Sequence, residues 1–202
     1  MEAQRGGAGV TVPEDAHREL MLRAIASEGD GHRAALRGEH EPARLAYEEA
    51  ASLYRASWEV APPASFGRLE GMLKAAVLAG DAGEAAAYVR AQIPDADDLS
   101  PPAAYALAVA ALVLGDDDEA ARRAEAMRAG SPAFGRAADA IAALAAGDGA
   151  AYRAALQAIV DDFAGRDEHL TGVAIADTAA MLEGLAAPRG LAADLSSPLL
   201  PR

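Results

Sequence analysis

The chain has 202 residues, which suits one domain or one continuous array of repeats and is long enough to bury a sizeable core. Its formal net charge is −13, with no cluster of lysines and arginines, so we expect neither nucleic-acid nor membrane binding. It has no cysteine, which excludes disulfides, thiolate metal sites and cysteine nucleophiles. Alanine makes up more than a quarter of the chain and strand-favouring residues are scarce, so the predicted fold class is all-α.

The N-terminal segment, residues 1–11, is rich in glycine and polar side chains, and we expect it to be disordered. It lacks the apolar stretch of a secretory signal peptide. The longest uncharged apolar run in the chain, residues 103–115, is too short to span a bilayer. These features together predict a cytoplasmic protein.

The first predicted helix begins at a capping-box pattern, with Thr11 and Glu14 at the required spacing and Pro13 in the first turn. Helical periodicity continues to about Arg37, with a candidate interruption at the sequence GDGH, residues 29–32.

A unit made of an apolar helix, a glycine with a neighbouring acid, and a second helix then recurs along the chain. Glycine supplies the left-handed residue that ends a helix, and an aspartate after it can cap the next one. Asp81 with Glu84, and Asp116 with Glu119, have the spacing of capping boxes. The turn glycines are Gly38, Gly80, Gly115 and Gly147.

Further helix starts are predicted where a serine precedes a proline, at Ser100–Pro101 and Ser131–Pro132. Two helices per unit, at spacings of 42, 35 and 32 residues between the turn glycines, indicate stacked helical hairpins.

The best-formed unit, Pro101 to Pro132, has small residues along its first helix, then GDDDEA and a closing proline. In these features the chain resembles the tetratricopeptide-repeat proteins, over roughly residues 30–165. The resemblance implies an α-solenoid of about four antiparallel helical hairpins. We expect a C-terminal capping helix to close a single domain over residues 12–187, followed by an extended tail over 188–202.

What the resemblance implies for function is a concave groove, lined by the first helix of each hairpin, that binds a peptide. The candidate groove residues are Lys74, Tyr105, Val109, Leu112, Val113, Ile141 and Leu144. An apolar face of this kind needs a cover, which the C-terminal segment, a second copy of the chain or a partner protein could each supply. We therefore expect a non-catalytic interaction module or scaffold that binds a protein, a peptide or itself as a homodimer. No cofactor is expected.

The sequence after the last hairpin predicts the capping helix over 173–187, with Thr171 as its N-cap and with Asp177 and Glu183 pointing outward. The acids around it suggest an alternative function, an enzyme or a small-molecule or metal-binding protein that uses the region from Asp161 to Asp177. No metal-ligand spacing supports this alternative. Its candidate residues are Asp162, Asp167, His169 and Asp177.

Overall fold

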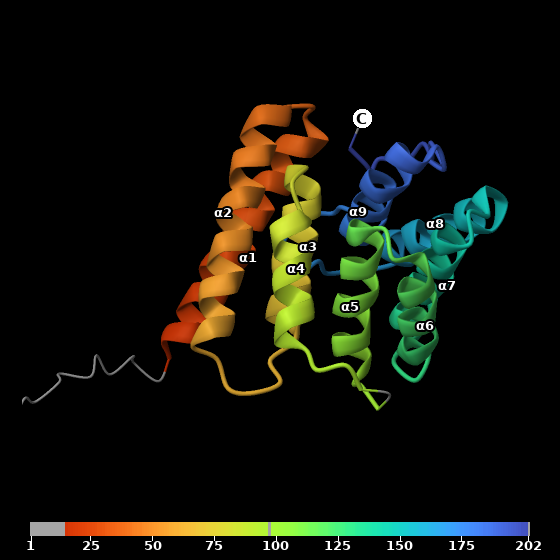
Figure 1. The fold of residues 1–202 in the computed structure, drawn as a ribbon. Coiled ribbons are helices and arrows are strands. Elements are labelled where there is room, and N and C mark those ends of the chain that lie inside the picture. The colour runs from red at the N-terminus through yellow and green to blue at the C-terminus, as the bar shows by residue number, and fades with distance from the viewer. Residues whose placement is uncertain (1–14, 97, 202) are drawn as a thin grey trace, which may run out of the picture.

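The computed structural model describes residues 15–96 and 98–201, and in this part of the chain the only regular elements are helices (Figure 1). The predicted all-α class is confirmed. The predicted disordered segment 1–11 and the capping box at Thr11 lie outside the described residues. The helices are α1 (Ala16–Leu36), α2 (His40–Glu59), α3 (Gly67–Ala79), α4 (Gly83–Gln92), α5 (Pro101–Leu114), α6 (Asp117–Met127), α7 (Pro132–Ala145), α8 (Gly149–Ala164) and α9 (Asp177–Ala186), followed by the short 3-10 helix η1 (Ala187–Arg189).

Consecutive helices pack on one another from α1 to α8, and the predicted turn glycines end the first helix of each pair. Each of these glycines has a positive φ, between 69° and 92°. Ser100 and Ser131 occupy the predicted N-cap positions of α5 and α7, although neither side chain makes a capping hydrogen bond. Asp116 caps α6, whereas the predicted cap at Asp81 is wrong because α4 begins after Ala82.

The predicted interruption at residues 29–32 is wrong, because α1 runs through both glycines without a break. Gly31 is required by its neighbour on α2: a Cβ at this position would lie 2.6 Å from the ring of Tyr47. The glycine therefore allows α1 and α2 to pack closely, and this contact outweighs the helix propensity lost at one residue.

One large hydrophobic core runs through the fold and contains buried residues from all nine α-helices in the described part of the chain. Helix α5 is its centre, with ten consecutive buried residues from Ala103 to Leu112. This helix packs against α3, α4, α6 and α7. Much of the core is alanine, which lets helices approach closely while each side chain buries little area.

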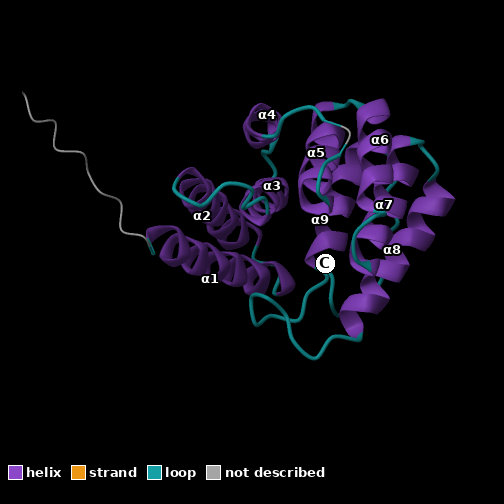
Figure 2. Cartoon of the chain, turned by 90° about the horizontal axis from the view of Figure 1, so that it is seen from below, coloured by secondary structure: helices purple, strands orange, loops and turns teal. Residues whose placement is uncertain are grey.

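Helix α9 packs against α3, α7 and α8, and Figure 2 shows the connection from α8 crossing to the end of α1. The predicted start of this helix at residue 173 is wrong. Gly172 has a φ of +70°, and the chain leads without helical structure to Asp177, while the Ala176 amide donates to the Leu199 carbonyl (2.9 Å). The Ala176 amide is therefore bonded to the C-terminal segment rather than within a longer helix.

Within the described residues, no helix combines the length and the apolar character needed to cross a membrane.

Candidate functional site

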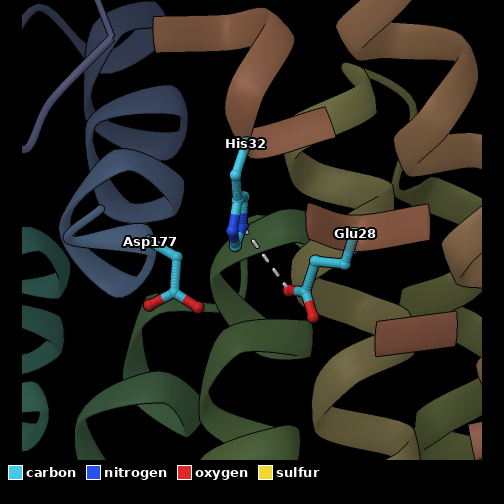
Figure 3. A group of neighbouring side chains, drawn as sticks. All are labelled: Glu28, His32 and Asp177. Carbon is cyan, nitrogen blue, oxygen red and sulfur yellow. Dashed lines mark ion pairs between the residues drawn. The ribbon is translucent and has the colours of Figure 1, made fainter. Parts of the chain in front are cut away.

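Four ionisable side chains meet where α1, α3 and α9 come together, and we call them the lysine-centred cluster. Glu28 and His32 lie one turn apart on α1, Lys74 lies on α3, and Asp177 is the first residue of α9. The Lys74 ammonium pairs with Glu28 Oε1 at 2.9 Å and with Asp177 Oδ2. Figure 3 shows Glu28, His32 and Asp177 pointing toward one another, with His32 Nε2 3.8 Å from Glu28 Oε1.

The surroundings of this cluster supply further hydrogen bonds. Tyr54 donates its hydroxyl hydrogen to Glu28 Oε2 at 2.7 Å, and Thr171 Oγ1 lies 3.0 Å from His32 Nδ1. Asp177 Oδ1 accepts from the Thr178 amide at 2.7 Å, at the positive end of the α9 dipole. The cluster therefore connects α1 with the C-terminal part of the chain, since Thr171 and His32 are 139 residues apart.

The charges of the cluster are arranged so that the lysine serves both carboxylates. Burial alone would lower the pKa of Lys74, but Asp177 and Glu28 hold that pKa well above its usual value. Burial would raise the pKa of Asp177, and Lys74 keeps it below its usual value. Burial lowers the pKa of His32 despite the nearby carboxylates, so this imidazole is neutral at pH 7.

Glu28, His32 and Asp177 could also be ligands for a metal ion, because one donor atom from each lies within 4.8 Å of the others. The position between the two carboxylates, however, is taken by the Lys74 ammonium. A divalent cation would have to displace a buried lysine that both acids stabilise. The donor set therefore fits the lysine that is present better than it fits a metal.

A cavity of about 210 Å³ adjoins this cluster, and we call it the aromatic cavity. Most of its lining residues come from α3 on one side and from α7 and α8 on the other, with Tyr105 of α5 between them. Figure 1 shows α5 lying between α3 and α7. Four aromatic side chains line it: Tyr54, Tyr105, Phe134 and Phe163. A pocket with an apolar lining and a few polar groups is the usual form of a small-molecule site.

The polar group that distinguishes this cavity is the carboxylate of Glu70 on α3. Glu70 is half-buried, and no described residue forms a hydrogen bond or an ion pair with its carboxylate. Burial raises the pKa of Glu70 to about 7, although Lys74, one turn further along α3, partly opposes this shift. A carboxylate that is partly desolvated and lacks a partner has an energetic cost, which a ligand can relieve.

On the opposite wall, Arg136 and Arg166 share a single acid, Asp162. Arg136 pairs with Asp162 Oδ1, and Arg166 Nη2 lies 2.5 Å from Asp162 Oδ2. The Arg166 guanidinium also stacks over the Phe163 ring, 3.7 Å from its centroid. These contacts hold two cations at the cavity wall against one anion.

A second cavity, of about 220 Å³, shares residues with the first, including Lys74, Phe163, Arg166 and Thr178. Its remaining wall is the segment that connects α8 to α9, together with His32 and Asp177. This segment therefore lies beside both the aromatic cavity and the lysine-centred cluster.

The predicted groove residues are mostly buried inside the fold. Exposure is 8% at Tyr105, 3% at Leu112 and 0% at Ile141, and Val113 is half-buried. Val109 and Leu144 are each 1% exposed, and Lys74 belongs to the lysine-centred cluster. Helix α9 packs on this region, and Arg189 donates to the Leu112 carbonyl at 2.8 Å. The C-terminal segment is thus one of the three expected covers, and it covers part of this face.

The alternative site residues do not converge on one point. Asp162 lines the aromatic cavity and Asp177 belongs to the lysine-centred cluster, while Asp167 is exposed. His169 stacks on Phe163 with ring centroids 6.2 Å apart. The predictions that Asp177 and Glu183 point outward are wrong: Asp177 pairs with Lys74, and Glu183 Oε1 accepts from Tyr152 and from the Ala193 amide, both at 2.9 Å.

The site residues predicted above include Lys74 but not Glu70, which lies one turn before it on α3. The available signal was their position inside the apolar sequence of α3, LEGMLKAAV, where an acid and a base need buried partners or a ligand. Glu28 and His32 gave a similar signal at helical spacing, but their partners are distant in sequence.

In comparisons with known proteins, no protein-family model, no curated protein and no solved structure matches this chain.

Proposed function

We propose that this chain binds a small organic molecule, without transforming it, in the aromatic cavity between α3, α5, α7 and α8. The observation that carries the proposal is the carboxylate of Glu70, which is partly desolvated, has no partner among the described residues and lines a cavity with four aromatic side chains. The alternative small-molecule site predicted from the sequence lies in the acidic region from Asp161 to Asp177. The proposed site is instead the aromatic cavity, which Asp162 also lines. A dry cavity of about 150 Å³ can hold one benzene molecule, so a cavity of about 210 Å³ suits an aromatic ring with a short chain.

We place the interaction-module hypothesis second. It is supported by the helix pairs and their glycine turns, on which we base the finer proposal of a helical repeat organisation of the tetratricopeptide type. Against a peptide groove stands the burial of its candidate residues under the chain's own helices. Binding of a partner protein or of a second copy remains a prediction.

The test uses a matched pair of glycine variants. Gly67 and Gly83 are the first residues of α3 and α4, and a Cβ added to either meets no atom within 4 Å. Gly67 lines the aromatic cavity, and Gly83 lines none of the cavities described above. Phenylalanine at Gly67 should obstruct the cavity mouth, while phenylalanine at Gly83 should leave it open.

The probe is 2-phenylethanol, a neutral molecule with one ring and a short chain, titrated into labelled protein and followed by amide chemical shifts. We expect shifts centred on the cavity lining, binding weakened about tenfold or more by Gly67→Phe, and wild-type binding by Gly83→Phe. Equal binding by the two variants, or shifts that map elsewhere, would contradict the proposal.

A further inference from the structure

The two walls of the aromatic cavity carry opposite surplus charges. On the α3 wall stand Glu70 and, behind it, the lysine-centred cluster, in which the ammonium of Lys74 serves two carboxylates. Because His32 is neutral at pH 7, this wall is negative once Glu70 is ionised. On the opposite wall two guanidinium groups share the carboxylate of Asp162, which leaves one positive charge in surplus among the residues that line the cavity there.

These surplus charges do not neutralise each other directly. Arg136, Arg166 and Glu70 all line the same cavity, yet both arginines pair with Asp162 and neither pairs with Glu70 in the described structure. The cavity space therefore lies between an acid with no partner among the described residues and two arginines that share one acid. Water can fill such a space, but a ligand with both charges would satisfy both walls at once.

The geometry points to a small zwitterion as the ligand: an α-amino acid or similar molecule whose ammonium group pairs with Glu70, whose carboxylate pairs with Arg136 and Arg166, and whose apolar side chain packs on the aromatic rings. This inference rests on the proposed function and adds the chemical class of the ligand. Aromatic faces would also favour the ammonium group, since Tyr54 and Tyr105 line the cavity with Glu70.

The volume and the lining of the cavity limit the size of the ligand's side chain. The ammonium and carboxylate groups of the ligand would occupy part of the 210 Å³, which leaves room for one ring or one branched alkyl group. Met21, Phe134 and Ile159 supply apolar contact surface. Phenylalanine is therefore a suitable first probe, and its single-charge analogues make the test specific.

The experiment compares four molecules that share a phenyl group with a short chain: L-phenylalanine, phenethylamine, 3-phenylpropanoate and 2-phenylethanol. Each is titrated into the wild-type chain at pH 7.5. This pH is about half a unit above the Glu70 pKa of about 7, so most of this acid is ionised. We expect L-phenylalanine to bind about tenfold or more tightly than any of the other three, because only it pairs with both walls.

Two charge-removing variants then assign the two contacts. Glu70→Gln should weaken L-phenylalanine and phenethylamine about tenfold and leave 3-phenylpropanoate unchanged or improved. Arg136→Gln should weaken L-phenylalanine and 3-phenylpropanoate and leave phenethylamine unchanged or improved. Thermal unfolding of each variant checks that it is folded, and a fold defect would weaken all four probes alike.

The outcomes separate the two proposals. If all four molecules bind with similar affinity and Gly67→Phe weakens each of them, the cavity binds small molecules and the zwitterion inference is overturned. If one single-charge analogue matches L-phenylalanine, the inference is also overturned, and that charge identifies the class instead. If none of the four binds, or if Gly67→Phe has no effect on binding, both proposals fail.

Discussion

Two charged residues one turn apart on α3, Glu70 and Lys74, have opposite surroundings. Lys74 contacts a carboxylate on either side, from α1 and from α9, while Glu70 faces a cavity and has no partner among the described residues. A buried charge that is fully paired contributes to the arrangement of helices, and removing its partner is costly. A desolvated charge without a partner has an energetic cost in the free protein, which is the usual situation of a binding group.

The largest effect should come from breaking the lysine-centred cluster. Lys74→Met leaves the carboxylates of Glu28 and Asp177 close together without a cation, so we expect a loss of about 3 to 5 kcal/mol in the free energy of unfolding. Urea denaturation at pH 7.5 measures the change. Arg55→Met is the control: Arg55 pairs with Glu59 at 3.2 Å on the exposed face of α2, and we expect a loss of about 1 kcal/mol or less. Similar losses in the two variants would show that the cluster is not structural.

The effect of removing Glu70 should have the opposite sign and depend on pH. The pKa of Glu70 is about 7 in the folded chain and 4.5 is the usual value, so the folded state binds this proton more tightly than the unfolded state. The contribution of Glu70 to stability is therefore most favourable below pH 4.5 and falls as the pH rises through 7. Glu70→Gln removes this loss of stability with rising pH.

We therefore expect Glu70→Gln to exceed the wild type in stability by up to about 3 kcal/mol at pH 8, with the difference shrinking toward pH 5. Urea denaturation of both proteins across this pH range measures it. A variant that is less stable than the wild type at pH 8 would mean that Glu70 has a partner in the folded protein.

The contact between α2 and α3 lies beside both the lysine-centred cluster and the aromatic cavity. We expect one added methyl group at this contact to lower the stability of the chain. A Cβ at Gly71 would lie 2.8 Å from the Tyr54 ring, and Tyr54 donates to Glu28. We expect Gly71→Ala to lose about 1 to 3 kcal/mol of stability through overpacking. On the same helix, Gly67→Ala meets open space and should be neutral or slightly stabilising. Equal thermal shifts in the two variants would contradict this packing.

The smallest expected effect concerns the segment between α8 and α9. Thr171→Val keeps the shape of the side chain but removes the hydroxyl that lies 3.0 Å from His32 Nδ1, so we expect a loss of about 1 kcal/mol. Thr171→Ser retains the hydroxyl and should recover most of this loss. If the serine variant were as unstable as the valine variant, the hydrogen bond would not be the cause.

Local sequence patterns predicted the helices well because their signals are local. Gly38, Gly80, Gly115 and Gly147 end helices with positive φ values, as expected from glycine followed by a second helix. The misplaced start of α9 has a tertiary cause: Thr171, the expected N-cap, contacts His32 instead, and the Ala176 amide bonds to the C-terminal segment. Capping rules cannot anticipate partners so far away in sequence.

The candidate site was only partly predictable for the same reason. Lys74, Tyr105, Asp162 and Asp177 were singled out from the sequence, but as members of two unrelated proposals. The structure places Lys74 beside Asp177, and it places Tyr105 and Asp162 around the aromatic cavity with Glu70. Which acid is paired and which is free depends on how α9 packs against α3, and no periodicity in the sequence contains that information.

The most direct test of the account is the pKa of the Glu70 side chain in the ligand-free protein. Carbon-detected NMR can follow the side-chain carboxyl carbons between pH 5 and pH 8.5, with the Glu70 signal assigned by its absence in Glu70→Gln. The account predicts that Glu70 titrates near pH 7, because it is partly desolvated and has no partner among the described residues. Titration at or below 4.5 would show that Glu70 is solvated or paired, and would contradict the proposed binding site.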